Sequence, residues 1–209
     1  MIEGIRHIIF DLGGVLLNIN YDLTEQAFIN LGIQNFPELY SQARQTSFFD
    51  EWEKGKITRD DFAARIVDLA GIQISAGDIT NAWNAMLLDF PLRRLQILQQ
   101  LRLHYDLFLL SNTNAIHEEA FNKILMQNNG IRNIGVFFDK VYYSHNIGMR
   151  KPDAEIYELV LAQHDLQPAH TLFIDDSPKN IQGAAALGIQ TIYLQKGMTI
   201  EQDVFKPKK

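Results

Sequence analysis

The stretch His7-Ile8-Ile9-Phe10-Asp11-Leu12-Gly13-Gly14-Val15-Leu16 decides the fold of this chain. A short apolar run bounded by turn residues is typical of a buried strand in a parallel sheet. Asp11 then stands at the carboxyl end of that strand, where open α/β sheets bind their ligands. Gly13 and Gly14 allow close backbone approaches that a side chain would prevent. A carboxylate there could ligate a metal or attack an electrophile, although aspartate also commonly ends a strand and starts a turn.

The composition is that of an ordinary folded protein. The chain has 209 residues, of which 46% are hydrophobic and 21% charged, which suits one large domain or a core with a smaller insertion. The net charge of −6 argues against a general binder of nucleic acid or membrane surfaces, yet it allows an anionic substrate at a locally cationic site. The chain has no cysteine, which excludes disulfides, thiolate metal sites and cysteine nucleophiles. With no signal-peptide core at the N-terminus and no apolar run of about 18 residues, we expect a cytoplasmic protein.

Residues 18–90 differ in pattern from the rest of the chain. Helix-start patterns occur at Asp22-Leu23-Thr24-Glu25, at Thr58 and at Ser75, and no strand-like alternation lies between them. The spacing predicts a small helical insertion of about four helices. Its core is expected to consist of aromatic residues: Phe28, Phe36, Phe48, Phe62 and Trp83.

From Pro91 onward, helices alternate with apolar strands. Strands are predicted at residues 106–110, 140–143, 171–174 and 190–194, with helices between them and a strong helix start at Ser177-Pro178. This alternation indicates an α/β protein with a doubly wound parallel sheet. We therefore expect a Rossmann-like core of residues 1–17 and 91–209, with a helical cap domain of residues 18–90. The charged tail, residues 197–209, is expected to pack on the surface or to fray.

Polar residues follow the strands at points that a parallel sheet brings to one edge. They are Asp11, Ser111 with Asn112, Asp175 with Asp176, and Lys151 from a loop before a helix. Each alone also fits a turn, a helix entry or a solvated charge. Three crowded carboxylates repel one another unless cations offset them, and Mg²⁺ prefers oxygen ligands and often bridges carboxylates to phosphate. With a lysine, a hydroxyl and an amide available to a tetrahedral anion, the set favours phosphoryl transfer, in which aspartate can be a covalent nucleophile.

These segments resemble the four motifs of the haloacid dehalogenase-like hydrolase superfamily, in the same order. The matching segments are residues 10–15, 110–113, 150–152 and 173–176. The resemblance covers essentially the whole chain, and the long gap after the first motif fits an inserted helical cap. Within the superfamily, the chain is most similar to the bacterial α-D-glucose-1-phosphate phosphatases. That similarity rests on residues 110–114 with His117, on residues 148–152, and on the cap segment Glu53-Lys54-Gly55-Lys56-Ile57.

The resemblance implies a Mg²⁺-dependent phosphatase that hydrolyses a small phosphorylated metabolite, such as glucose 1-phosphate, through an aspartyl-phosphate. It implies that Asp11 attacks phosphorus and that Lys151 orients Asp11 and the phosphate. Ser111 and Asn112 are expected to hold the transferring oxygens, with His117 as a further substrate contact. The implied metal ligands are Asp11, the carbonyl of Gly13 and Asp175, with Asp176 close by. The cap is expected to select the substrate through Asp50, Glu51, Trp52 or Glu53, although Trp52 also suits the cap core.

The chain departs from most phosphatases of this superfamily at Gly13. They carry there a second aspartate, which acts as general acid and later as general base, whereas the similar sugar-phosphate phosphatases also carry glycine. The proton donor for the leaving group is thus unassigned; His117 is a candidate by placement, although a histidine early in a surface helix is more often simply exposed.

Three rival functions remain open. A non-catalytic phosphate-binding or regulatory protein is disfavoured by the retention of Asp11, Lys151 and both late aspartates. A metal-free dehalogenase usually has tyrosine where Gly13 stands and lacks an acidic pair such as Asp175-Asp176. A phospho-accepting receiver domain has similar ingredients, but its acidic pair comes early in the chain.

Overall fold

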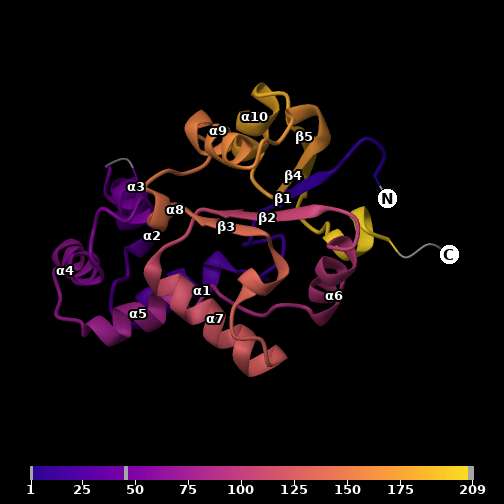
Figure 1. Cartoon of the computed structure of the whole chain (residues 1–209). Coiled ribbons are helices and arrows are strands. Elements are labelled where there is room, and N and C mark those ends of the chain that lie inside the picture. Colours follow the sequence, from indigo (N-terminus) through magenta and orange to yellow (C-terminus); the bar gives the residue numbers. More distant parts are fainter. Residues whose placement is uncertain (1, 45–46, 207–209) are drawn as a thin grey trace.

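Five parallel strands form the centre of the computed structural model, which describes residues 2–44 and 47–206, with backbone only for 41–44 (Figure 1). They are β1 (His7–Phe10), β2 (Asp106–Ser111), β3 (Lys140–Tyr143), β4 (Thr171–Asp175) and β5 (Gln190–Tyr193), in the order β3-β2-β1-β4-β5. The register pairs Phe10 with Leu109 on one side and with Ile174 on the other. All the strands therefore end at one edge, as the predicted doubly wound sheet requires.

Helices cover both faces of the sheet. Helices α9 (Ala154–Gln163) and α10 (Pro178–Ala186) pack on one face, while α6 (Leu92–Leu101) and α7 (Ala115–Asn129) pack on the other (Figure 1). Strand β1 contributes Ile9 to the first interface and Ile8 and Phe10 to the second, because successive side chains of a strand point to opposite faces. The apolar run at the start of the chain is explained by burial on both sides. Among the described helices, none has the length and apolar character needed to span a membrane.

Short elements complete the core. They are the turns η1 (Ile134–Phe137) and η2 (Pro168–His170), helix α8 (Ser144–Ile147), and the π-helical turn η3 (Ile200–Val204). The described part of the tail packs rather than frays: Ile200 is fully buried, and Glu201 Oε2 lies 2.9 Å from Nε of the buried Arg94 in α6. Residues 207–209, which the predicted tail includes, lie outside the described residues.

Five helices lie between residues 21 and 84 of the described chain, and we call them the helical region. They are α1 (Tyr21–Asn30), α2 (Phe36–Arg44), α3 (Phe48–Glu53), α4 (Arg59–Ala70) and α5 (Ala76–Asn84). The estimate of about four helices was low because the stretch before Lys54 divides into α2 and α3. The expected aromatic core is confirmed: Phe28, Phe36, Phe62 and Trp83 are buried together, with Phe48 packed partly buried against them. Figure 1 shows this region at one end of the sheet and both chain termini at the other.

Hydrogen bonds of single side chains set where these helices begin. Thr58 Oγ1 accepts from the Asp61 N–H at 3.1 Å, and a carboxylate oxygen of Asp61 accepts from the Thr58 N–H at 3.4 Å. Ser75 caps α5 in a similar way, so both predicted starts are confirmed. The start at Asp22 is wrong, because Asn20 Oδ1 accepts from the Asp22 N–H at 3.1 Å and is the true N-cap.

A short antiparallel stem joins the helical region to the sheet. The Asn18 N–H donates to the carbonyl of Asp89 at 2.9 Å, and the Leu88 N–H donates to the carbonyl of Asn18 at 3.0 Å. The next pair runs from the Asn20 N–H to the carbonyl of Met86 at 2.8 Å. The chain thus leaves and rejoins the core at one place, shortly after β1 and its glycines.

Candidate active site

Three carboxylates meet where β1 and β4 end. Asp11 follows β1, Asp175 is the last residue of β4, and Asp176 comes next. One carboxylate oxygen from each lies within 4.8 Å of the others. The Asp11 N–H donates to the carbonyl of Ile174 at 2.9 Å, which holds the two strand ends in register. Three anionic oxygens at this spacing are a donor set suited to a hard divalent cation such as Mg²⁺.

Lys151 places a positive charge among these carboxylates. Its Nζ donates to Asp11 Oδ1 and to Asp175 Oδ2, both at 2.7 Å, and the residue is only 1% exposed. Burial lowers the pKa of Lys151, but the two carboxylates outweigh burial and leave that pKa above its ordinary value. The lysine is therefore a fixed cation, and its ammonium also lies 5.3 Å from the centre of the Phe173 ring.

One lysine does not neutralise three carboxylates. Burial raises the pKa of Asp11 to about 7, opposed by Lys151 and reinforced by the charges of Asp175 and Asp176. Loss of solvent around its carboxyl, and then the charge of Asp175, raise the pKa of Asp176 to about 6. A divalent cation bound between them would remove this repulsion, so the residues present fit a Mg²⁺ site.

Asp175 is held by two residues, Ser177 and Asn180, that no pattern in the sequence marks as its partners. Its Oδ1 accepts from the Ser177 N–H at 2.7 Å, and Asn180 Nδ2 lies 3.1 Å from each of its carboxylate oxygens. Helix α10 begins at Pro178, as predicted, but Ser177 contributes its backbone N–H rather than a capping side chain. Asn180 is an unremarkable polar residue in the first turn of a helix, so no pattern in the sequence marks its role.

Gly14 makes room for the third carboxylate. Its φ is +73°, a conformation that L side chains rarely adopt, and a Cβ on it would collide with the carboxyl group of Asp176. The same turn is closed by the Gly14 N–H, which donates to the carbonyl of Leu17 at 2.9 Å. Gly13, whose carbonyl is a predicted metal ligand, lies in this turn between Asp11 and Gly14.

The residues at the end of β2 orient Lys151 and offer a hydroxyl. Asn112 Oδ1 accepts from the Lys151 N–H at 2.9 Å, and Asn112 Nδ2 donates to the Lys151 carbonyl at 2.8 Å. Asn112, predicted to contact substrate, thus clamps the main chain of the lysine. Ser111 is buried at the end of β2 and makes no side-chain hydrogen bond to the residues that the structure describes, so its hydroxyl can donate to a bound anion.

His117 is engaged elsewhere. Its ring stacks on that of Trp83 at a centroid distance of 5.4 Å, with Nε2 3.1 Å from the Trp83 carbonyl and Nδ1 3.2 Å from Asn114 Nδ2. Both contacts are hydrogen bonds when Nε2 carries the only ring proton. Burial lowers the pKa of His117 to about 4. The expectation of an exposed histidine is wrong, and these contacts favour a structural role between α5 and α7 over the predicted substrate contact.

The candidates for substrate selection also have partners within the protein. Trp52 is buried in the aromatic core of the helical region. Glu51 accepts a hydrogen bond from the serine that precedes α3, at 3.1 Å. Asp50 and Glu53 form ion pairs with Arg150, the residue before the site lysine.

Known proteins share this arrangement of sequence and fold. The family model for haloacid dehalogenase-like hydrolases matches residues 5–188. A D-ribitol-5-phosphate phosphatase from Bacteroides thetaiotaomicron is 32% identical over 200 residues, which cover 96% of this chain and 97% of the relative. A family enzyme from the same organism, solved as an aspartate-to-alanine variant with magnesium and inorganic phosphate, has a TM-score of 0.86 and 34% identity over 93% of this chain and 96% of that one. A related hydrolase from Porphyromonas gingivalis has a TM-score of 0.83 and 30% identity over 93% of each chain. By the match along most of its length, this chain belongs to the haloacid dehalogenase-like hydrolase family.

Proposed function

We propose that this hydrolase, a Mg²⁺-using phosphatase of its family, removes phosphate from a small sugar or polyol phosphate. The observation that carries the proposal is the buried Lys151 ammonium, which bridges Asp11 and Asp175 beside a third carboxylate. The ribitol-phosphate phosphatase that resembles it over nearly its whole length supports a polyol or sugar phosphate. Glucose 1-phosphate, which the motif resemblance suggests, is one candidate among these.

Asp11 is the proposed nucleophile. Its carboxylate attacks phosphorus, the ester bond between phosphorus and the leaving oxygen breaks, and an aspartyl-phosphate forms on Asp11 while that oxygen takes up a proton and departs as an alcohol. Water then loses a proton and attacks the same phosphorus, so that phosphate leaves and the free carboxylate returns. Lys151 holds Asp11 in place and presents its charge to the phosphoryl oxygens, while the Ser111 hydroxyl donates to one of them.

Asp11, the carbonyl of Gly13, Asp175 and Asp176 are the residues that would hold Mg²⁺. When bound, the ion offsets the carboxylate charge and lets a phosphate dianion approach. Lys151 alone leaves the group with a net negative charge, which would repel such a substrate.

We also propose that residues 18–90 act as a cap domain on a catalytic core of residues 1–17 and 91–209. The stem places the helical region directly after the loop that carries Asp11. A domain in this position can exclude water from the reaction and contact the leaving group.

A panel of phosphate esters tests the activity, with ribitol 5-phosphate, glucose 1-phosphate and a small aryl phosphate, each with Mg²⁺ and with chelator. We expect phosphate release that requires Mg²⁺, and no release by Asp11→Asn, which keeps the size of the side chain. Undiminished phosphate release in chelator would contradict the proposal. Binding of Mg²⁺ and phosphate without turnover of any ester would favour the non-catalytic alternative.

Single-turnover hydrolysis in oxygen-18 water tests the covalent step. If Asp11 attacks phosphorus, water opens the intermediate at phosphorus, and the label appears in phosphate and not in the peptide that contains Asp11. An ester to carbon, as in a dehalogenase, is opened at the carboxyl carbon. Label in Asp11 after turnover would therefore overturn the assignment.

A further inference from the structure

Charged contacts join helix α3 to the loop that carries the site lysine, and the proposed chemistry does not use them. We call residues 148–153 the lysine loop. Arg150 in this loop forms ion pairs with Asp50 and with Glu53, the second at 2.9 Å between Nε and Oε2. Lys54 Nζ lies 3.1 Å from Oδ2 of Asp153, at the end of the same loop. Residues 50–54 of the helical region therefore form ion pairs on both sides of Lys151, with Arg150 before it and with Asp153 after it.

Backbone contact reinforces these ion pairs. Gly55 has a φ of +67°, and a Cβ on it would collide with the carbonyl oxygen of His145 in α8. Helix α8 ends at Ile147 and leads straight into the lysine loop. The chain after α3 thus lies against α8, the element just before the loop, so closely that only glycine fits. Glu53, Lys54 and Gly55 belong to the cap segment that is similar to the phosphatases. These three residues are where the helical region contacts α8 and the lysine loop.

The core holds the opposite side of the lysine loop. Asn112 makes two hydrogen bonds to the main chain of Lys151. Gly183 of α10 approaches the loop so closely that a Cβ would lie 2.7 Å from the carbonyl oxygen of Pro152. The loop that carries Lys151 is therefore held both by the core and, at the adjacent Arg150, by helix α3.

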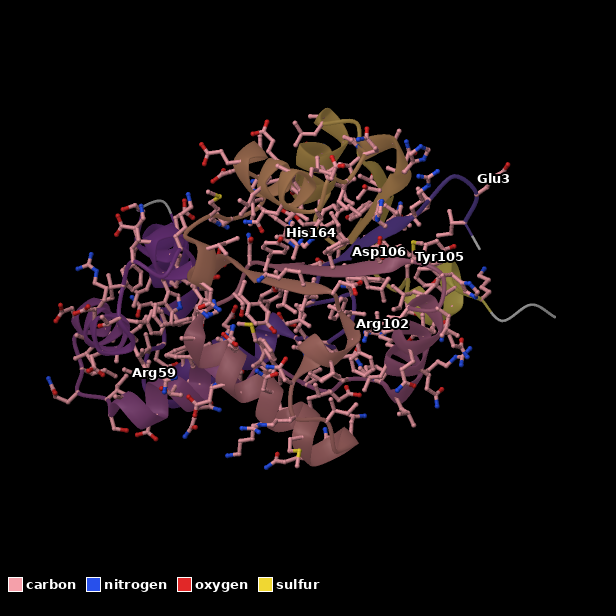
Figure 2. All side chains as sticks on the ribbon, in the orientation of Figure 1. Glu3, Arg59, Arg102, Tyr105, Asp106 and His164 are labelled. Atoms are coloured by element: carbon pink, nitrogen blue, oxygen red, sulfur yellow. The ribbon has the colours of Figure 1, made fainter. Side chains whose placement is uncertain are left out.

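A second ion pair provides a comparison. Arg59 of α4 and Glu119 of α7 also join the helical region to the core, at 2.8 Å, but their side chains are 46% and 72% exposed. The side chains of Arg150, Glu53 and Asp50 are 23%, 30% and 56% exposed. Solvent screens the Arg59 pair more strongly, and that pair ends on α7 rather than on the lysine loop. Figure 2 shows Arg59 at the end of the molecule formed by the helical region, far from Tyr105 and Asp106 at the opposite end.

We propose that Arg150, held by Asp50 and Glu53, is a positioning residue for Lys151. Docking of α3 on Arg150 fixes the loop so that the ammonium lies between the two carboxylates that it bridges. The inference rests on the proposed function of Lys151 in phosphoryl transfer. Its consequence is that helix α3 affects the rate on every substrate, including one too small to contact the helical region.

The test uses a double variant that carries both Asp50→Asn and Glu53→Gln, which we call the α3 variant. Its matched control is the single variant Arg59→Gln. A small aryl phosphate serves as substrate because it has no sugar hydroxyls for Asp50 or Glu53 to bind. We expect kcat of the α3 variant to fall about tenfold with KM changed less than about twofold, since lysine placement matters most in the transition state. Arg59→Gln should keep kcat within about twofold. Equal losses in both variants, or a loss confined to KM, would overturn the proposal.

A double-mutant cycle asks whether the effect passes through Arg150. Arg150→Gln should lower kcat about as much as the α3 variant, and combining them should add less than about twofold, because all three changes break one coupled contact. Arg150→Lys keeps the charge and should recover part of the rate. Losses that multiply in the combined variant would show that α3 acts by another route.

Binding of aluminium fluoride, which mimics the phosphoryl group in transfer, separates failure of this proposal from failure of the proposed function. Calorimetry in Mg²⁺ needs no turnover, and the α3 variant should bind aluminium fluoride about tenfold more weakly than wild type and than Arg59→Gln. If wild type hydrolyses no ester, the proposed function fails, while the fluoride affinities still decide the role of Arg150. If wild type is active and the α3 variant equals it in kcat and in fluoride affinity, the role of Arg150 alone is refuted.

Discussion

Replacing His117 by glutamine should make the protein less sensitive to acid. In the native state, the neutral ring donates from Nε2 to the carbonyl of Trp83 and accepts at Nδ1 from the amide of Asn114. That amide cannot turn to offer its oxygen, because Asn114 Oδ1 already accepts from the His117 N–H at 3.0 Å. A second ring proton would therefore face another donor. Loss of solvent around the buried ring lowers the pKa of His117 to about 4, although the hydrogen bond to the Trp83 carbonyl opposes this shift.

The size of the effect follows from the two pKa values. An unfolded chain takes up this proton near the ordinary value of 6.5, whereas the native state takes it up only near 4. Between these values the unfolded state binds more protons, so stability falls as the pH falls. At about 1.36 kcal/mol per pKa unit, the loss is about 1.4 kcal/mol at about pH 5.5 and about 2.6 kcal/mol at about pH 4.5. Glutamine cannot titrate and should not show this loss.

Urea unfolding of wild type and His117→Gln between about pH 8 and about pH 4.5, both in chelator, measures the difference in free energy of unfolding. Taking the difference at each pH cancels the titration of the site carboxylates, which both proteins share. The variant should be less stable than wild type near pH 8, where it has lost the ring stacked on Trp83, and the gap should shrink or reverse in acid.

Two results would refute this reasoning. One is a free-energy difference that stays constant within about 0.5 kcal/mol across the pH range. The other is a proton NMR signal of the His117 ring that titrates near the value of an exposed histidine.

Three further predictions concern the carboxylate site. Gly14→Ala should weaken Mg²⁺ binding by roughly tenfold or more in calorimetry, because the new methyl group displaces the carboxylate of Asp176. The control is Gly71→Ala, where φ is +66° and an added Cβ meets no atom within 4 Å. It should cost only about 1 kcal/mol of strain and leave the metal affinity unchanged. Asn180→Ala should lower the free energy of unfolding, measured in urea, by about 1–2 kcal/mol and should also weaken Mg²⁺ binding, because it removes hydrogen bonds from the fully buried Asp175. An unchanged unfolding midpoint would contradict this. Mg²⁺ affinity should fall as the pH drops from about 7.5 to about 5.5. The reason is that the pKa of Asp11 is about 7 and that of Asp176 about 6, so protons bound to these carboxylates must leave before the metal binds. An affinity independent of pH would count against that linkage.

The sheet could be predicted because the signals that create it are local. Strand β1 is apolar throughout its centre since both its faces are buried, and β3 has the predicted bounds, Lys140–Tyr143. Parallel pairing then brings the residues at the strand ends to one edge, so the sequence alone predicts that Asp11, Ser111 and Asp175 lie near one another.

Contacts between distant segments could not be predicted in this way. Arg150 and Asp50 are 100 residues apart in the chain, and only packing of α3 on the lysine loop brings them together. The capping pattern at Asp22 failed for a related reason. Thr24, expected to belong to that cap, is buried and donates to the carbonyl of Trp83 at 3.1 Å, a tertiary contact that outweighs the local pattern. His117 is likewise buried against α5, and the sequence of its own helix, α7, does not indicate this contact.

The antiparallel stem of the helical region has a consequence for how such a protein can diversify. Because Asn18 and Asp89 are hydrogen-bonded to each other, the stem, and not the inserted helices, sets the separation of the two points where the insertion is attached. A different set of helices could therefore be exchanged at this junction without stretching the turn that carries the nucleophile, so lineages could change the inserted part while the reaction machinery stayed the same. The exchange would also be constrained where the inserted helices meet the core, above all at Arg150, which any replacement would need to meet with an anionic surface.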